Sequence, residues 1–370
     1  MAKSLDLAGI EAAARETVRR WVTDPAISNR DRLVLTGSGD SLFAARATAP
    51  ALKRWTGLQV QPMTAMEFAR YEVALVGERD VLVALSNSGS SSRTREAVLL
   101  ARAAGIPSLG ITGSPDGPLA RTADAVLLRS VLPLDDLPGD IGRVFLNLVE
   151  YCAALHALYA FGLEMGLANG RVDEAQRDAC LLEARQAVAN LGSMADAMAP
   201  DVEALVESAP DIDTLWIIGA GPNAGTADYS AAKLHEQVPI NGISQDLEEW
   251  AHLQYFLTLA WKERSIAVVL APLGNAFDRA MELVVGIRGA GGRCVLVTNT
   301  TQAVEPAECV IRVPAPADEL LTPITFHLPC QLIALRLAQL RDVRPTPLRR
   351  RDDYWLIRKG AVRSDLSGLS

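Results

Sequence analysis

The chain has 370 residues, of which 49% are hydrophobic and 22% are charged, so it is globular and long enough for two domains. Its formal net charge of −8 argues against nucleic acid and against a membrane surface as partners, since either favours a basic excess. The five cysteines have no metal-ligand spacing and the N-terminus lacks the apolar core of a signal peptide, so we expect reduced thiols and a cytoplasmic location.

The first predicted elements alternate between helices and strands. A helix over residues 10–21 precedes a strand over 33–37 that ends in Gly37-Ser38-Gly39, and a further strand covers 81–85. Both strands are largely apolar, which is typical of parallel sheets that are buried on both faces. These patterns predict an α/β fold.

A loop rich in glycine and hydroxyls, Ser86-Asn87-Ser88-Gly89-Ser90-Ser91-Ser92, follows the strand over 81–85 and precedes a helix. Backbone N–H groups at a helix N-terminus are unpaired, and serine hydroxyls add hydrogen-bond donors with little bulk. The loop therefore predicts a site for an anion such as a phosphate. An ordinary serine-rich turn is the alternative.

A long apolar helix is predicted over residues 151–167. His156 and Glu164 interrupt its apolar surface, and it is too short to span a bilayer comfortably, so no membrane partner is expected. The next stretch, 171–210, is polar with apolar residues at helical spacing, which predicts a helix that links two domains.

The second half of the chain repeats the first at an offset of 182–186 residues. The strand over 215–219 ends in Gly219-Ala220-Gly221, and residues 266–298 repeat the order strand, glycine loop, helix, strand. The second glycine loop, 271–277, has lost nearly all hydroxyls, so we expect only the first loop to hold a phosphate. Neither G-x-G turn continues to a third glycine, which disfavours a nicotinamide or flavin cofactor.

The repeat predicts two doubly wound parallel-sheet domains with helices on both faces, followed by a C-terminal tail. The predicted boundaries are 1–170 for the first domain, 171–345 for the second and 346–370 for the tail, which is free to cover a site. Within the tail, Arg349-Arg350-Arg351 is interpreted as a solvated face, with an anion contact as the alternative.

The serine loop, the turn Gly37-Ser38-Gly39-Asp40-Ser41 and the repeat itself resemble the tandem sugar isomerase (SIS) family, which includes the isomerase half of glucosamine-6-phosphate synthase. The resemblance extends from about Leu33 to Arg341. It implies two doubly wound SIS domains and a phosphosugar as the small-molecule partner, with no metal or organic cofactor. The phosphate-binding residues that it implies are Ser38, Gly39, Ser86, Asn87, Ser88 and Ser91.

The segment Ala232-Lys233-Leu234-His235-Glu236 is similar to the K-L-x-E helix of the same family. The resemblance implies that Glu236 moves a proton between C1 and C2 of the open-chain sugar, and that Lys233 orients Glu236 or contacts a sugar hydroxyl. An ordinary salt-bridged surface helix is the alternative for this pair.

His252 follows Glu236 by sixteen residues, the separation at which the family places its ring-opening histidine. In the family this histidine reaches the neighbouring subunit, which implies a homodimer with a shared active site. A satisfied structural histidine is the alternative. No such match is found for His156, which is expected in the core, or for His235 and His327.

The chain departs from the family in two segments. Residues 135–145 replace a Glu and a Val-Ala-Ser-Thr-Lys run that lie over the sugar, so the substrate can differ. Asp352 stands where a lysine closes the site, five residues after Pro347, and Lys359 is the candidate substitute as a lid residue.

These residues imply a phosphosugar aldose–ketose isomerase or deaminase that acts on a hexose 6-phosphate derivative. We expect amino-sugar phosphate deamination with isomerisation, and no glutamine-hydrolysing activity because residue 2 is Ala rather than Cys. Three alternatives stay open: simple isomerisation, cleavage of a sugar phosphate–amine adduct by a deglycase, and non-catalytic phosphosugar binding by a regulatory protein.

Overall fold

The computed structural model describes residues 5–24, 27–129, 139–304 and 307–344. Internal contacts divide this part of the chain into two compact units. The N-terminal domain comprises residues 5–129 and 145–185, and the C-terminal domain comprises residues 139–144 and 186–344. This division lies fifteen residues beyond the predicted boundary at residue 170, inside a long helix. The predicted tail, 346–370, lies outside the described residues.

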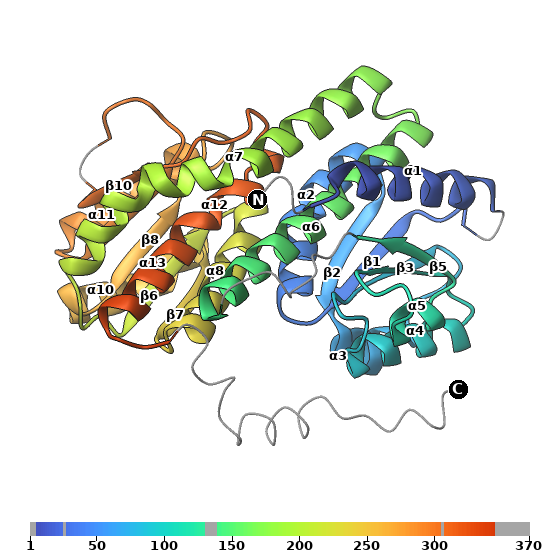
Figure 1. Ribbon diagram of the computed structural model, residues 1–370, viewed down its shortest axis with the longest axis horizontal. Coiled ribbons are helices and arrows are strands. Elements are labelled where there is room, and N and C mark those ends of the chain that lie inside the picture. Colours follow the sequence, from blue (N-terminus) through green and yellow to red (C-terminus); the bar gives the residue numbers. More distant parts are fainter. Residues whose placement is uncertain (1–4, 25–26, 130–138, 305–306, 345–370) are drawn as a thin grey trace. The chain divides into compact units, whose positions relative to one another are not determined.

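The elements of the N-terminal domain alternate between strands and helices (Figure 1). They are α1 (Leu7–Thr23), β1 (Arg32–Gly37), α2 (Asp40–Thr56), β2 (Gln59–Thr64), α3 (Ala65–Glu67), the π-helix η2 (Phe68–Glu72), β3 (Asp80–Leu85), α4 (Ser92–Ala103), β4 (Ser108–Thr112), α5 (Pro118–Thr122) and β5 (Ala125–Leu128). Two long helices follow, α6 (Gly139–Ala168) and α7 (Glu174–Glu207), and α7 continues into the C-terminal domain.

The C-terminal domain repeats this alternation. Its elements are β6 (Thr214–Gly219), α8 (Pro222–Gln237), β7 (Asn241–Asp246), α9 (Leu247–Glu249), the π-helix η4 (Trp250–Gln254), α10 (Tyr255–Trp261), η5 (Lys262–Arg264), β8 (Ile266–Leu270), α11 (Phe277–Gly289), β9 (Arg293–Thr298), β10 (Cys309–Arg312), η6 (Glu319–Leu321), α12 (Pro323–Phe326) and α13 (Leu328–Leu340).

Each domain contains one parallel five-stranded sheet. The strand order is β2-β1-β3-β4-β5 in the N-terminal domain and β7-β6-β8-β9-β10 in the C-terminal domain, so the two halves have the same topology. In both sheets the order reverses direction at the first strand, which creates a switch point where such sheets bind ligands. The prediction of two parallel-sheet α/β domains is confirmed.

Local backbone details follow the same repeat. The glycines that precede α2 and α8, Gly39 and Gly221, have φ angles of 58° and 55°, a left-handed conformation that glycine adopts without strain. The second strand of each sheet is followed by a three-residue helix and a π-helix, η2 in one domain and η4 in the other. The repeat therefore extends beyond the strands to the connecting turns.

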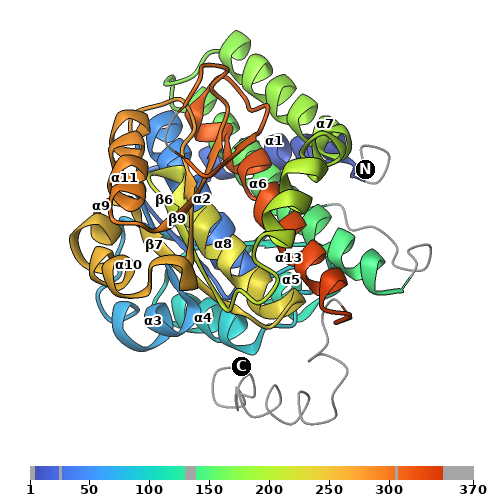
Figure 2. The same ribbon diagram turned by 90° about the vertical axis from the view of Figure 1, so that its left-hand side faces the viewer.

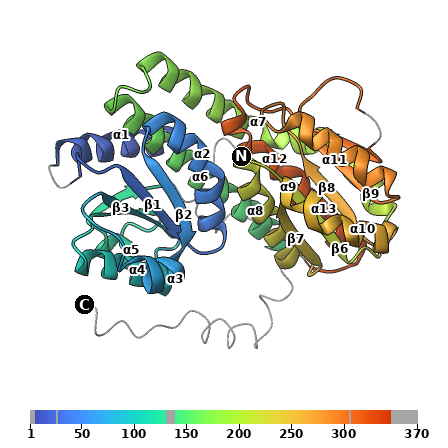
Figure 3. The same ribbon diagram turned by 180° about the vertical axis from the view of Figure 1, so that it is seen from behind.

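Helices cover both faces of the N-terminal sheet (Figures 1 and 3). On one face, Val34, Leu82 and Ala84 pack with Ala97 and Val98 of α4. On the other face, α2 contacts β1 and β2, and α1 contacts β5. Because alternate residues of a strand point to opposite faces, the apolar runs of β1 and β3 supply both layers of the core.

Two helical segments, 144–168 and 319–340, are long and apolar enough to cross a membrane by length and composition alone. Both are largely buried in the structure, as the core helices of globular proteins are. In the first segment, His156 lies 2.9 Å from Glu11 and Glu164 lies 3.2 Å from Arg15, so these two side chains have partners within the N-terminal domain.

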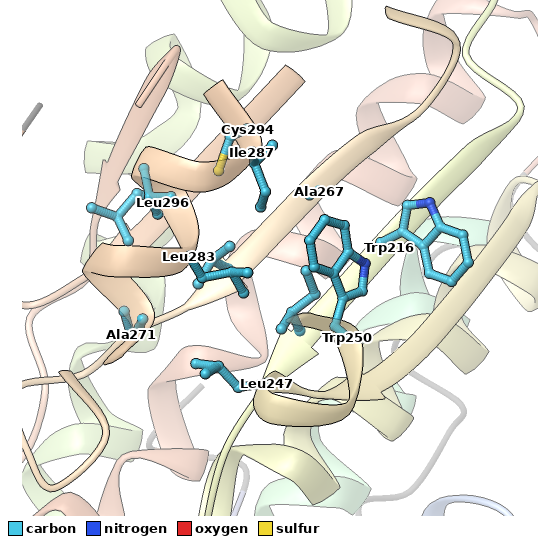
Figure 4. Close-up of a cluster of buried hydrophobic side chains, with 13 residues drawn as sticks. Trp216, Leu247, Trp250, Ala267, Ala271, Leu283, Ile287, Cys294 and Leu296 are labelled. Atoms are coloured by element: carbon cyan, nitrogen blue, oxygen red, sulfur yellow. The ribbon is translucent and has the colours of Figure 1, made fainter. Parts of the chain in front are cut away.

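One core layer of the C-terminal domain is built around tryptophans (Figure 4). Trp216 of β6 and Trp250 of η4 pack with Leu283 and Ile287 of α11 in one buried cluster. Trp250 is only 1% exposed, so it fixes the start of η4 against the sheet. Trp250 thereby also fixes the backbone position of His252, which lies two residues further along η4.

Candidate active site

The predicted phosphate loop lies at the carboxyl end of β3 and is fixed to the neighbouring strand β4. The Ser86 amide donates to the Ile111 carbonyl at 3.1 Å, and the Gly113 amide donates to the Asn87 carbonyl at 3.0 Å. Gly89 has φ of 65°, and a Cβ there would lie 3.1 Å from the Thr112 hydroxyl oxygen. The loop therefore has a defined shape before any ligand arrives.

Three serines of this loop, Ser88, Ser90 and Ser91, are at least partly exposed. The side chain of Ser91, the N-cap of α4, accepts no hydrogen bond from a backbone amide of that helix. Instead the Thr94 hydroxyl donates to Ser91 Oγ at 3.1 Å, which leaves the Ser91 hydroxyl hydrogen for another acceptor. Ser88 and Ser90 are exposed, with their hydroxyl oxygens 2.7 Å apart. Helix N–H groups and hydroxyls arranged this way suit a phosphate.

The structure brings the second predicted donor group to the same edge. Ser38 and Gly39 are exposed in the turn between β1 and α2, and β1 is the direct neighbour of β3 in the sheet. The carboxyl ends of neighbouring parallel strands lie together, so this turn and the serine loop flank the switch point of the N-terminal sheet.

The corresponding loop of the C-terminal domain already holds an anionic group from the same chain. Glu319 of η6 accepts a hydrogen bond from the Asn275 amide at 3.0 Å, and a Cβ at Gly274 would collide with its carboxylate. The Leu273 amide donates to Asn299 Oδ1 at 2.7 Å. The loss of hydroxyls predicted an unused loop, but the role of Glu319 could not be foreseen, because it lies 44 residues away in the sequence.

Lys233 and Glu236 lie on α8 in the C-terminal domain. Lys233 Nζ is 2.8 Å from Glu236 Oε2, with the lysine side chain fully buried and the glutamate side chain 30% exposed. The ion pair between Lys233 and Glu236 is therefore not an ordinary surface ion pair. Lys233 Nζ also lies 4.8 Å from the ring centroid of Tyr229, one turn earlier on the helix.

His327, to which the sequence assigns no role, lies in the same buried region. Its ring meets that of Tyr229 edge to face, with centroids 5.5 Å apart. Burial lowers the pKa of His327 to about 3, and the positive charge of Lys233 acts in the same direction. His327 is therefore neutral at physiological pH.

His252 is exposed on η4, where its charge interacts with Glu248, and Glu248 forms an ion pair with Arg279 at 2.7 Å. The hydrogen bond from Arg279 lowers the pKa of Glu248. The structure thus places His252 at the surface of the C-terminal domain. Lys359 and most of the departing segment 135–145 lie outside the described side chains.

A cavity of about 820 Å³ in the N-terminal domain lies away from the serine loop. It is lined by Trp21, Arg30, Ile106 and Asp124 among others, and it contains none of the predicted site residues.

Within the described ranges, no group of three His, Cys, Asp or Glu side chains is placed to bind a metal ion. Burial raises the pKa of the thiols of Cys152, Cys294 and Cys330 to about 12.

Comparisons with known proteins agree with the resemblance found in the sequence. Residues 26–160 match the SIS domain. A glutamine–fructose-6-phosphate aminotransferase (isomerizing) of Pyrococcus horikoshii is 26% identical over 317 residues, which cover 85% of this chain and 50% of that protein. The chain therefore spans about half the length of the curated relatives it matches.

Solved structures share the fold. The C-terminal domain of glucosamine-fructose-6-phosphate aminotransferase from Francisella tularensis aligns with a TM-score of 0.74 and 17% identity, over 91% of this chain and 95% of that one. A structure described as glucosamine-6-phosphate deaminase from Thermotoga maritima aligns with a TM-score of 0.64 and 14% identity, over 92% and 96%. The chain therefore contains a SIS domain at residues 26–160 and is homologous to the isomerizing aminotransferases over about half of their length.

Proposed function

We propose that the chain is a phosphosugar isomerase built from two SIS domains, and that it deaminates an amino-sugar 6-phosphate while isomerising it to a ketose phosphate. The observation that carries the proposal is the serine loop. Its hydroxyls and the open first turn of α4 lie beside the Gly39 turn at the switch point of the N-terminal sheet. The shared strand order of the two sheets supports SIS topology in both domains.

In this proposal the phosphate is bound by hydroxyls and amides of the N-terminal domain, with no cofactor. Ser86, Asn87, Ser88 and Ser91 supply donors from one loop, and the turn at Ser38 and Gly39 supplies donors from the other. Hydrogen bonds to a dianion are stronger than those to neutral acceptors, so a few such donors suffice to anchor the substrate.

The chemistry falls to the C-terminal domain. His252, contributed by the partner subunit of a homodimer, exchanges protons with the ring oxygen and anomeric hydroxyl and so opens the ring. Glu236 then removes the proton from C2 and returns it to C1, and Lys233 orients the glutamate. The aldehyde becomes a C1 alcohol, and the resulting C2 imine is hydrolysed by water to the ketone and ammonia.

The buried pair on α8 favours an enzyme over a regulatory phosphosugar-binding protein. Phosphate capture needs the serine loop alone, whereas burying the ammonium of Lys233 against Glu236 is costly unless the pair has a use. A cytoplasmic location, the absence of nucleic-acid and membrane partners, and a lid formed by Lys359 belong to the same proposal.

The test is turnover of glucosamine 6-phosphate, followed by separate assays of ammonia and fructose 6-phosphate. We expect both products in equal amounts, and a loss of at least about 10²-fold in rate for Glu236→Gln, the scale of a lost general base. Glu249→Gln is the matched control, because Glu249 is exposed on α9 of the same domain. Ketose phosphate without ammonia from unaminated sugars would identify a simple isomerase. A rate unchanged by Glu236→Gln would refute the assignment.

A further inference from the structure

The inner face of α8 is polar, although it is completely buried. Asn223, Thr226, Ser230, Lys233 and Gln237 recur at intervals of three or four residues and are all 0% exposed. That spacing places them on one helix face, which normally carries apolar side chains when it is buried. Figure 2 shows α13 alongside α8, and the two helices are in contact. Polar groups are costly to bury, so this face calls for an explanation.

Part of the explanation is a chain of contacts that ends at Glu236. The Gln331 amide donates to the Tyr229 hydroxyl at 2.6 Å, which fixes the tyrosine ring from α13. His327 holds the same ring by its edge contact. Lys233 Nζ lies 4.8 Å from the centroid of that ring and 2.8 Å from Glu236 Oε2.

The electrostatics of these contacts favour a fixed position for the ammonium group of Lys233. A cation near an aromatic ring is attracted by the ring quadrupole, and the attraction is larger when water is excluded, as it is around the fully buried Lys233. Because His327 is neutral, it adds no repulsion. With its side chain enclosed, Lys233 acts on Glu236 rather than on a sugar.

We propose that Tyr229, supported by His327 and Gln331, is a positioning residue that holds the Lys233 ammonium against one oxygen of Glu236 and thereby sets the orientation of the catalytic carboxylate. This inference rests on the proposed function only in so far as it takes Glu236 to be the catalytic base. The placement of Lys233 by the Tyr229 ring stands whether or not the chain turns over a sugar.

The test compares Tyr229→Leu with Tyr229→Phe in the full chain. Leucine removes the ring, whereas phenylalanine keeps it and loses only the hydroxyl. With glucosamine 6-phosphate, we expect Tyr229→Leu to lower kcat about 10- to 30-fold, the scale of a desolvated cation–π contact, with KM changed less than about threefold. Tyr229→Phe should keep kcat within about threefold of wild type. Tyr71→Leu is the control, because Tyr71 is 73% exposed.

A second measurement does not depend on activity. The carboxyl carbon of Glu236 is followed by ¹³C NMR against pH, with Glu236→Gln identifying its signal. We expect its titration midpoint to move to higher pH in Tyr229→Leu but not in Tyr229→Phe, because a displaced ammonium stabilises the carboxylate less. The titratable groups on α8 and on the elements packed against it, Asp228, His235, Asp246, Glu319, His327, Cys330 and Arg336, are the same in all variants.

The outcomes separate the two proposals. If wild type fails to turn over phosphosugars while the titration shifts as expected, the proposed function is wrong and the positioning role holds. An unshifted titration in a folded Tyr229→Leu variant would overturn the positioning role. So would equal losses of kcat in the leucine and phenylalanine variants, because the ring would then have no role of its own.

Discussion

Replacing His327 with Gln should remove a pH-dependent loss of folding stability. Burial lowers the pKa of His327 to about 3, against an ordinary value of 6.5, so below pH 6.5 the unfolded chain binds a proton that the folded chain does not. Stability therefore falls as pH decreases from 6.5 towards 3, by at most about 1.4 kcal/mol per pH unit from this group. Between pH 7.5 and 5 the loss amounts to about 2 kcal/mol.

The assay is urea unfolding of wild type and His327→Gln at pH 7.5, 6 and 5, followed by tryptophan fluorescence. The variant can be less stable than wild type at pH 7.5 because its packing is altered. Between pH 7.5 and pH 5, however, the free energy of unfolding of wild type should fall by about 2 kcal/mol relative to that of the variant. His235→Gln is the control, because His235 is exposed on α8. If the two free energies of unfolding instead differ by the same amount at every pH, His327 can be protonated in the folded state. The conclusion that Tyr229 packs against a neutral imidazole would then be wrong.

Three further predictions concern the N-terminal domain. Ser88→Ala should weaken phosphate binding by roughly 1–3 kcal/mol in calorimetric titration, the scale of a hydrogen bond to a charged group, and an unchanged affinity would remove Ser88 from the site. Gly89→Ala should lower the free energy of unfolding by about 1–2 kcal/mol in urea, because φ is 65° there. Although burial raises the pKa of Glu11, hydrogen bonds from His156 and Arg185 lower it overall, so Glu11→Gln should destabilise by about 1–3 kcal/mol at pH 7, and equal stability would show that this ion cluster contributes nothing.

The central strands and their glycine turns could be predicted because their signals are local. The apolar runs that became β1, β3 and β6 each end at a glycine turn, and the repeat made each half evidence for the other. The edge strands β2 and β5 are harder to predict, because β2 alternates polar with apolar residues and is partly exposed, and the apolar run of β5 is only four residues long. The serine loop can be predicted as a candidate phosphate site for the same reason as the central strands, because its hydroxyls lie in a single contiguous segment.

The surroundings of Glu236 could be predicted only along α8 itself. The spacing of Lys233 and Glu236 predicts that they share a helix face, and the structure adds that Lys233 is buried. Tyr229 meets Gln331 across 102 residues of sequence, and no periodicity relates such distant positions. His327 looked unremarkable for the same reason, and the carboxylate of Glu319 in the second glycine loop is a further case of a long-range partner.

In the proposed reaction, Glu236 moves a proton from C2 to C1 of a phosphosugar that the serine loop binds. The most direct test uses glucosamine 6-phosphate carrying deuterium at C2, with the product examined by NMR. We predict that deuterium leaves C2 and is found at C1 or in water, that ammonia is released in step, and that both events stop in Glu236→Gln. Product that forms with the Glu236→Gln variant at the wild-type rate, or no loss of deuterium from C2 under any condition, would contradict the account.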